Sequence, residues 1–390
     1  MGPSRRGQVP PFEVMSIVDR VARLRSEGAD VVSLCVGEPI QGAPDAVRQA
    51  MAAAMDGRPL GYSSPSGLAE LRSALAALHR TRYGIDVDPR NIVVTTGSSG
   101  AFILAFLSAF DAGQAVAVPR PGYPAYANIL RSLNLDVVEI PAAADEGYRL
   151  HIEDLAAAHA RTPLSGVVVA SPNNPTGTMM TAEALGELAA WCSANGVRLV
   201  SDEIYHGITA DGSIGACAWA CGPQDSLVVS SFSKYWGMTG WRLGWMLVPE
   251  DLIEAVDALS GNLALCAPVP AQVAALAAFG EQAEAEARRA IDSYAEGRAL
   301  VSAASSRLGW REAPAEGAFY VYADISSSLR EGEDSRVWCT ALLDEDGVAI
   351  TPGWDFDRVN GGHTVRLSLA VGPQQVAEAL ARIEAWLVQR

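Results

Sequence analysis

Residues 227–244 have the sequence Leu-Val-Val-Ser-Ser-Phe-Ser-Lys-Tyr-Trp-Gly-Met-Thr-Gly-Trp-Arg-Leu-Gly, an apolar run followed by hydroxyls and charges. The stretch contains Lys234, the single lysine of a chain that has 28 arginines among its 29 basic residues. Arginine stays protonated in proteins, whereas a lysine amine can lose its proton and attack a carbonyl carbon to form an imine. Lys234 is therefore a candidate reactive amine, and the alternative is a chance remnant of an arginine-rich composition.

The residues around Lys234 favour a phosphate-binding turn. Ser231 follows the predicted strand 227–230, and Arg242 lies eight residues beyond the lysine. Hydroxyls and a permanently charged guanidinium suit a phosphate, and three glycines in residues 237–244 let the backbone turn closely around it. A competing interpretation is a Ser-x-x-Lys motif with Ser231 as an acyl-enzyme nucleophile. That motif requires a later Lys-Thr-Gly, which a chain with one lysine lacks.

The chain alternates β-branched runs with helical stretches, a rhythm that predicts an α/β fold with a mostly parallel sheet. The predicted strands are residues 92–94, 115–118, 166–170, 197–200 and 227–230, and the helices include 101–110, 125–133 and 182–195. A longer helical stretch, 271–305, is interrupted near Gly280, and an α+β segment follows from about Gly317 to Arg390. Because ligands bind at the carboxyl ends of strands in such sheets, we expect a site there.

Three further motifs follow predicted strands. Thr96 to Gly100 joins a strand to a helix and leaves free amides for an anion at Ser98 and Ser99, although an ordinary capped loop has the same composition. Ser171 to Gly177 and Asp202 to Tyr205 follow the next two strands, where turn and cap chemistry offer the alternative. With the lone lysine, these motifs indicate a cofactor with a phosphate, a basic ring nitrogen and a phenolic oxygen, which pyridoxal phosphate combines.

On these motifs the chain resembles the fold-type I pyridoxal-phosphate enzymes, specifically the class I/II aminotransferases related to aspartate and alanine aminotransferases. The motifs occur in family order over nearly the whole chain, and Arg366 in Val-Arg-Leu-Ser completes them. The resemblance implies a large cofactor-binding domain with a mostly parallel sheet, residues 45–284. It also implies a smaller α+β domain built from both termini, residues 1–44 and 285–390.

The resemblance implies roles for the catalytic residues. Lys234 holds the cofactor as an internal aldimine and then moves a proton from the substrate α-carbon. Asp202 pairs with the pyridine nitrogen and keeps it protonated, so that the ring takes up carbanion electrons. Tyr205 and Asn174 hydrogen-bond the phenolic oxygen. Tyr123 stacks on the ring, with simple core packing as its alternative role.

The family match also implies how phosphate and substrate are held. The phosphate ligands are Ser98, Ser99, Ser231 and Arg242, with Tyr62 reaching over from a neighbouring subunit, so a homodimer with shared active sites is expected. The substrate α-carboxylate meets Arg366 bidentately, with help from Asn174 and Gly37.

The implied reaction is transamination between a neutral or hydrophobic amino acid and a 2-oxo acid. Relatives for acidic substrates carry a lysine where this chain has Ser99, and Ile40 is an apolar residue expected at the pocket entrance. Lyases, cyclases and oxidases share the scaffold and remain the alternative. A regulator that only senses the cofactor would need a DNA-binding domain, for which the segment before Val31 is too short.

Composition limits the other possibilities. The chain has 390 residues, 49% of them hydrophobic, and 45 acidic residues give a net charge of −16. Without a basic tract we expect no nucleic-acid partner. No apolar run has membrane-spanning length and no secretion signal is visible, so we expect a cytoplasmic protein that binds no membrane. The six cysteines are expected to be free thiols, and the scattered histidines predict no metal site.

Overall fold

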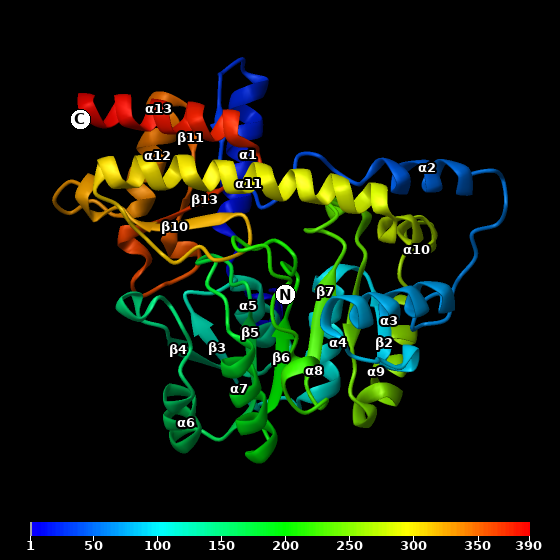
Figure 1. The fold of residues 1–390 in the computed structure, drawn as a ribbon. Helices are drawn as coiled ribbons and strands as arrows, with labels where there is room; N and C mark the ends of the chain where they lie inside the picture. Colours follow the sequence, from blue (N-terminus) through cyan, green and yellow to red (C-terminus); the bar gives the residue numbers. More distant parts are fainter. Residues whose placement is uncertain (1) are drawn as a thin grey trace.

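The computed structural model describes residues 2–390, and its largest element is a seven-stranded sheet with the strand order β2-β8-β7-β6-β5-β3-β4 (Figure 1). Only β8 runs antiparallel to its neighbours. The strands are β2 (Ile92–Thr95), β3 (Ala115–Arg120), β4 (Asp136–Pro141), β5 (Leu164–Ala170), β6 (Arg198–Asp202), β7 (Leu227–Ser231) and β8 (Gly244–Leu247). The predicted α/β fold with a mostly parallel sheet is confirmed.

The five predicted strands are present, whereas β4 and β8 were not expected. β8 consists of Gly-Trp-Met-Leu, which contains no β-branched residue to mark a strand. β4 is an edge strand with mostly partly exposed or exposed residues, so it lacks the apolar run that identifies a central strand.

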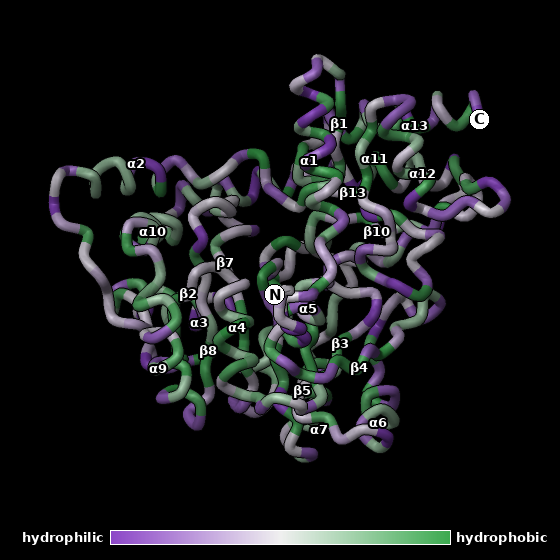
Figure 2. Tube along the Cα trace, turned by 180° about the vertical axis from the view of Figure 1, so that it is seen from behind, coloured by the Kyte–Doolittle hydropathy of each residue, from purple (hydrophilic) through white to green (hydrophobic). Residues whose placement is uncertain are grey.

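Helices cover both faces of the sheet because its strands are buried on both sides. Val167 and Val169 pack in one core with α3, α6 and α7, and Val168 packs in another with α4, α5 and α9. Hydrophobic residues recur between hydrophilic ones along the helices that surround the sheet (Figure 2). The helices are α3 (Ala69–Tyr83), α4 (Gly97–Ala109), α5 (Pro124–Ser132), α6 (Ile152–Arg161), α7 (Ala182–Ala194), the short α8 (Ala218–Cys221) and α9 (Ile253–Ala264).

A second group of elements combines both ends of the chain. The four-stranded sheet has the order β12-β13-β10-β9, and β1 pairs in parallel with β11. The elements of this second group are α1 (Glu13–Ser26), β1 (Val32–Ser33), β9 (Arg311–Glu312), β10 (Tyr320–Asp324), α12 (Ser335–Asp346), β11 (Val348–Ala349), β12 (Thr351–Pro352), β13 (Thr364–Ser368) and α13 (Pro373–Gln389). The predicted carboxyl-terminal α+β segment is thus present.

The long helix α11 (Glu281–Leu308) extends along one edge of the molecule, from α13 towards α2 (Asp45–Ala54) and α10 (Val269–Ala275) (Figure 1). The interruption predicted near Gly280 is confirmed, because α10 passes into a 3-10 turn (Leu276–Phe279) and Gly280 precedes α11. Tyr294 and Val301 of α11 are buried in the same core as β10 and β13.

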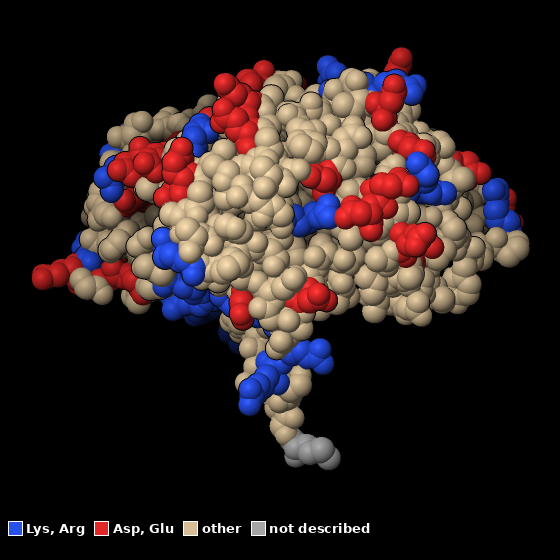
Figure 3. Space-filling model, turned by 90° about the horizontal axis from the view of Figure 1, so that it is seen from below, with Lys and Arg blue, Asp and Glu red and all other residues tan. Residues whose placement is uncertain are grey.

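The charged side chains and the cysteines of the structure come from scattered positions of the sequence. Asp and Glu groups are interspersed with Lys and Arg groups on the face seen in Figure 3. The six cysteines are free, four of them buried, as expected. Among the residues described, no helix is long and apolar enough to cross a membrane, and no group of His, Cys, Asp and Glu side chains is arranged to hold a metal ion.

Candidate active site

Lys234 lies three residues after β7, at the carboxyl end of a buried strand. Its Nζ donates a hydrogen bond to the Gly37 carbonyl oxygen at 2.7 Å. Burial, helped by the positive charge of Arg366, lowers the pKa of the amine from 10.5 to about 8. A larger share of this amine is therefore deprotonated near neutral pH than of an exposed lysine, as imine formation requires.

Asp202 is the last residue of β6 and is 4% exposed. Tyr126 Oη donates a hydrogen bond to Oδ2, and the Ile204 N–H donates one to Oδ1 at 3.1 Å. Burial raises the pKa of the carboxyl group to about 6 despite these donors. A protonated ring nitrogen beside Asp202 would compensate for burial and hold the carboxylate ionised.

The start of α4 and Arg242 form an anion-binding cradle. Thr96, the N-cap residue, makes no side-chain hydrogen bond to the first turn, so the cap leaves the amides there free. Arg242 has a left-handed backbone with φ 51°, and its Nη1 donates to the Thr239 carbonyl at 2.8 Å. A Cβ on Gly97 would lie 2.5 Å from Arg242 Nη2, so glycine allows the guanidinium to lie against the helix terminus.

The three predicted phosphate serines differ in their surroundings. Ser98 and Ser99 lie in the first turn of α4, partly exposed and exposed respectively. Ser231 is buried, its Oγ accepts from the Ser233 N–H at 3.0 Å, and it lies 2.9 Å from the Leu243 carbonyl, to which it donates. To donate to a phosphate, the Ser231 hydroxyl has to exchange its bond to Leu243.

Arg366 of β13 is 4% exposed, and contacts on several sides fix the orientation of its guanidinium. Nη1 donates to Asn174 Oδ1 at 3.0 Å, and Nη2 donates to the Cys35 carbonyl. The guanidinium carbon lies 4.3 Å from the ring centroid of Tyr320 and 4.8 Å from that of Phe356. Nε has no partner among the described residues, so this oriented fork retains a donor for a ligand carboxylate.

Asn174 and Tyr205 bring two further polar groups to the same region. Asn174 follows β5, and Tyr205 lies three residues after Asp202; both are 5% exposed. Burial raises the pKa of the Tyr205 phenol, which therefore stays protonated and can donate a hydrogen bond. Tyr205 Oη lies 3.1 Å from Tyr320 Oη.

Tyr123 lies at the start of α5 and contributes an aromatic wall. Burial, with the nearby Tyr320 phenol and Asp202 carboxylate, raises the pKa of Tyr123 to about 12. Its ring stacks on that of Phe12, with centroids 5.8 Å apart and an interplanar angle of 24°. Phe12 thus extends the aromatic surface from the amino-terminal segment.

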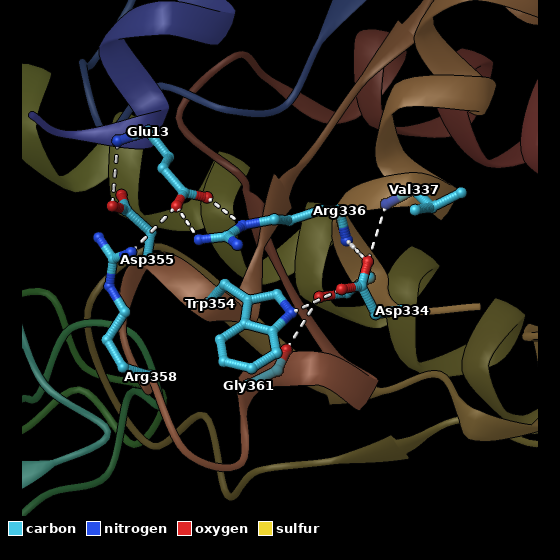
Figure 4. Close-up of polar contacts among 9 residues, drawn as sticks. Glu13, Asp334, Arg336, Val337, Trp354, Asp355, Arg358 and Gly361 are labelled. Carbon is cyan, nitrogen blue, oxygen red and sulfur yellow. Dashed lines mark hydrogen bonds and ion pairs between the residues drawn. The ribbon is translucent and has the colours of Figure 1, made fainter. Parts of the chain in front are cut away.

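The segment that carries Phe12 is held by an ion-pair group at the start of α1, which we call the Glu13 cluster (Figure 4). Arg336 Nε donates to Glu13 at 3.0 Å and Arg358 Nη1 donates at 3.3 Å. The Glu13 N–H donates to Asp355 Oδ1 at 3.1 Å. These contacts tie the amino-terminal helix to residues near Phe356, which packs on Arg366.

Tyr62 is 82% exposed. It belongs to the irregular segment between α2 and α3. That exposure leaves the hydroxyl available to another molecule.

The arrangement fits pyridoxal phosphate in three ways. The uncapped start of α4 and Arg242 suit the phosphate, and buried Asp202 suits a protonated ring nitrogen. Lys234, whose pKa is lowered, suits the aldehyde. The free Nε of Arg366 adds a place for a substrate carboxylate.

Four residues of the site are missing from the sequence prediction, namely Phe12, Tyr126, Tyr320 and Phe356. Tyr126 has one local signal, because the spacing of three from Tyr123 places both rings on one side of a helix. The others resemble ordinary core aromatics in sequence, and only the packing of distant elements brings them to the site.

Comparison with known proteins is consistent with this geometry. The family model described as aminotransferase class I and II matches residues 29–383. The valine–pyruvate aminotransferase of Mycobacterium tuberculosis is 49% identical over 98% of this chain and 97% of its own length. The aspartate/prephenate aminotransferase of Thermus thermophilus is 34% identical over 98% of this chain and 97% of its own length.

The fold agrees as well. The crystal structure of an aminotransferase from Mycobacterium tuberculosis superimposes with a TM-score of 0.96 at 48% sequence identity, and the match covers 100% of both chains.

Proposed function

The chain belongs to the class I and II aminotransferases, and we propose that this member acts on neutral aliphatic amino acids. The family consists of pyridoxal-phosphate enzymes of fold type I that move an amino group from an amino acid to a 2-oxo acid. The observation that carries the substrate proposal is the charge distribution around Lys234. The charged side chains that affect the pKa of the Lys234 amine are Arg366, Glu38, Arg242 and Asp202.

Three of these four charged groups already have a partner in the proposed reaction. Arg366 is assigned to the α-carboxylate, Arg242 to the phosphate and Asp202 to the ring nitrogen. The remaining charge, Glu38, is negative, and it accepts a hydrogen bond from Thr239 Oγ1 at 2.5 Å. Among these four groups no cation remains for a second substrate carboxylate, and an unpaired buried carboxylate costs several kcal/mol. Neutral side chains avoid this cost.

The activity for which the Mycobacterium tuberculosis relative is named supports the same proposal. That protein is a valine–pyruvate aminotransferase, and at 49% identity it is more similar to this chain than the aspartate/prephenate enzyme at 34%. We propose valine or a similar branched amino acid as the donor and pyruvate as an acceptor.

Bound pyridoxal phosphate supplies an aldehyde for imine formation and a ring that takes up the electron pair left at the substrate α-carbon. With the cofactor bound, Lys234 Nζ would take up the proton of the substrate α-carbon and release it again, because an amine with a pKa of about 8 can both accept and release a proton near neutrality. Asp202 would hold a proton on the ring nitrogen. Arg366 orients the α-carboxylate, with Asn174 and the backbone near Gly37 beside it.

The remaining assignments belong to the same proposal. Ser98, Ser99 and Ser231 join Arg242 at the phosphate, Tyr205 and Asn174 serve the phenolic oxygen, and Tyr123 covers the ring. Tyr62, with its exposed side chain, serves the site of a second subunit in a homodimer. We also propose the domain division at residues 45–284 against 1–44 and 285–390, and a cytoplasmic location. The pairing of β1 with β11 supports the combination of both termini in one domain.

The experiment adds single amino acids to the purified holoenzyme without an acceptor and follows cofactor absorbance and released products. Valine or alanine should convert the cofactor once per site, with kcat/KM at least about 30-fold above that of aspartate, as a cost of about 2 kcal/mol or more implies. Equal or better conversion by aspartate would refute the substrate proposal. Catalytic release of ammonia, pyruvate or peroxide would instead identify a lyase or an oxidase.

A further inference from the structure

Tyr320, the first residue of β10, meets three parts of the site at once. Its Oη lies 3.1 Å from Tyr205 Oη, and its ring carries the Arg366 guanidinium 4.3 Å from the centroid. The hydroxyl also lies against Gly37, where a Cβ would be 1.8 Å from Tyr320 Oη. The residue is 2% exposed, so water competes little for its hydroxyl.

We propose that Tyr320 is a positioning residue of the cofactor site, whose hydroxyl donates its proton to Tyr205 Oη and thereby directs the Tyr205 proton towards the ligand. The inference rests on the proposed function, in which Tyr205 donates to the phenolic oxygen of the cofactor. Tyr320 itself needs no contact with the cofactor for this role.

The surroundings of the two phenols set the direction of the hydrogen bond. Burial raises the pKa of both phenols and the Arg366 charge opposes the rise in both, but the guanidinium lies directly over the Tyr320 ring, 4.3 Å from its centroid. Tyr205 experiences the Asp202 carboxylate in addition, which raises its pKa further. The more acidic phenol is the better donor, so Tyr320 donates and Tyr205 accepts.

Donation by Tyr320 has two consequences for Tyr205. It occupies an acceptor position on Tyr205 Oη, so the Tyr205 proton has to point elsewhere. It also polarises the Tyr205 O–H bond, because hydrogen bonds in a chain strengthen one another in a buried site. A stronger donor stabilises the anionic form of a bound phenolic oxygen and lowers the pH at which the cofactor changes its absorbance.

Gly37 makes this arrangement possible. Its carbonyl accepts from Lys234 Nζ, and the missing side chain leaves the space that Tyr320 Oη occupies. One backbone position therefore borders both the reactive amine and the phenol pair.

The experiment titrates the absorbance of substrate-free holoenzyme with pH in the wild type, Tyr320→Phe, Tyr205→Phe and the double variant. Tyr320→Phe keeps the ring on Arg366 and removes only the hydroxyl. We expect its midpoint to rise by about half a pKa unit, as the loss of one hydrogen bond implies. In the Tyr205→Phe background, Tyr320→Phe should add no further shift, because Tyr320 acts through Tyr205.

Tyr322→Phe is the matched control. Tyr322 lies two residues along the same strand, is equally buried, and its hydroxyl accepts from Thr364 Oγ1 at 2.6 Å. Its removal costs a comparable hydrogen bond and should leave the midpoint unchanged. Cofactor affinity, measured by fluorescence quenching, should remain within about threefold of the wild-type value in Tyr320→Phe and in Tyr322→Phe.

Three outcomes contradict the inference. An unchanged midpoint in Tyr320→Phe means that its hydroxyl does not act on Tyr205, and a lowered midpoint means that Tyr205 donates to Tyr320. An equal shift in the Tyr205→Phe background means that Tyr320 acts by another route. Failure of the proposed function is distinguishable, because a different donor preference appears in the single-amino-acid experiment and leaves this titration unchanged. A wrong assignment of Tyr205 appears as an unchanged midpoint in Tyr205→Phe.

Discussion

Replacement of Arg366 by lysine keeps the positive charge and removes the planar fork. The guanidinium lies 4.3 Å and 4.8 Å from two ring centroids and donates to Asn174 and to the Cys35 carbonyl. An ammonium loses one of the two bonds to a carboxylate, about 1.5–3 kcal/mol for a hydrogen bond to a charged group. Poorer stacking on the rings costs about 1 kcal/mol more. We expect Arg366→Lys to lower kcat/KM about 100-fold, a loss of about 3 kcal/mol.

Steady-state kinetics with valine and pyruvate, compared with the absorbance of the bound cofactor, measures this effect. The cofactor spectrum should change little, because Arg366 is assigned to the substrate. Arg390→Lys is the control, since Arg390 also packs on an aromatic ring, 4.2 Å from the Trp386 ring centroid, and has a polar partner, Glu333. None of these three residues belongs to the site. A kcat/KM for Arg366→Lys within about threefold of wild type would refute the assignment of Arg366, because that factor is under 1 kcal/mol.

Three further predictions concern the amine, its protonation and the second subunit. Lys234→Arg should abolish turnover and the borohydride-reducible cofactor link, since no other lysine exists to form an imine, and mass spectrometry of the reduced protein tests this. The lowered pKa of Lys234, about 8 against 10.5, means that the unfolded chain binds more protons between these values. The stability of cofactor-free wild type relative to Lys234→Met should therefore rise with pH across that window, as denaturation at pH values near 8 and 10 will show. Mixing Tyr62→Phe with Lys234→Ala subunits should restore activity in hybrid dimers, whereas formed hybrids without such recovery would argue against shared sites.

Sequence order alone predicts the residues that follow parallel strands. Asp202, Lys234 and the first turn of α4 lie near the carboxyl ends of β6, β7 and β2, which run in the same direction, so the α/β topology brings them to one edge of the sheet. Each also belongs to a polar motif after an apolar run. Local pattern and topology therefore agree at these positions, and the structure places them as the pattern indicates.

Contacts between distant elements are not predictable in the same way. Tyr126 reaches Asp202 across 76 positions of sequence, and Tyr320 reaches Tyr205 across 115. Both tyrosines belong to mostly apolar segments, where an aromatic ring indicates only core packing. Nothing in the spacing shows that the hydroxyl faces a functional group, because that depends on how β10 and α5 pack against the large sheet.

Two different sheets share the work of the site. Lys234 and Asp202 are carried by the seven-stranded sheet, whereas Arg366 and Tyr320 belong to the four-stranded sheet. If Arg366 binds the substrate carboxylate as proposed, displacement of one sheet against the other by about 1 Å would misplace that carboxylate, and losses of about 100-fold follow from such errors in orientation. The cofactor contacts on the larger sheet would survive the same displacement. The Gly37 carbonyl, four residues after β1, accepts a hydrogen bond from Lys234 Nζ at 2.7 Å. This bond connects the segment after β1 with the amine that the larger sheet carries. Substitutions that loosen this junction should therefore impair substrate turnover before they impair cofactor binding.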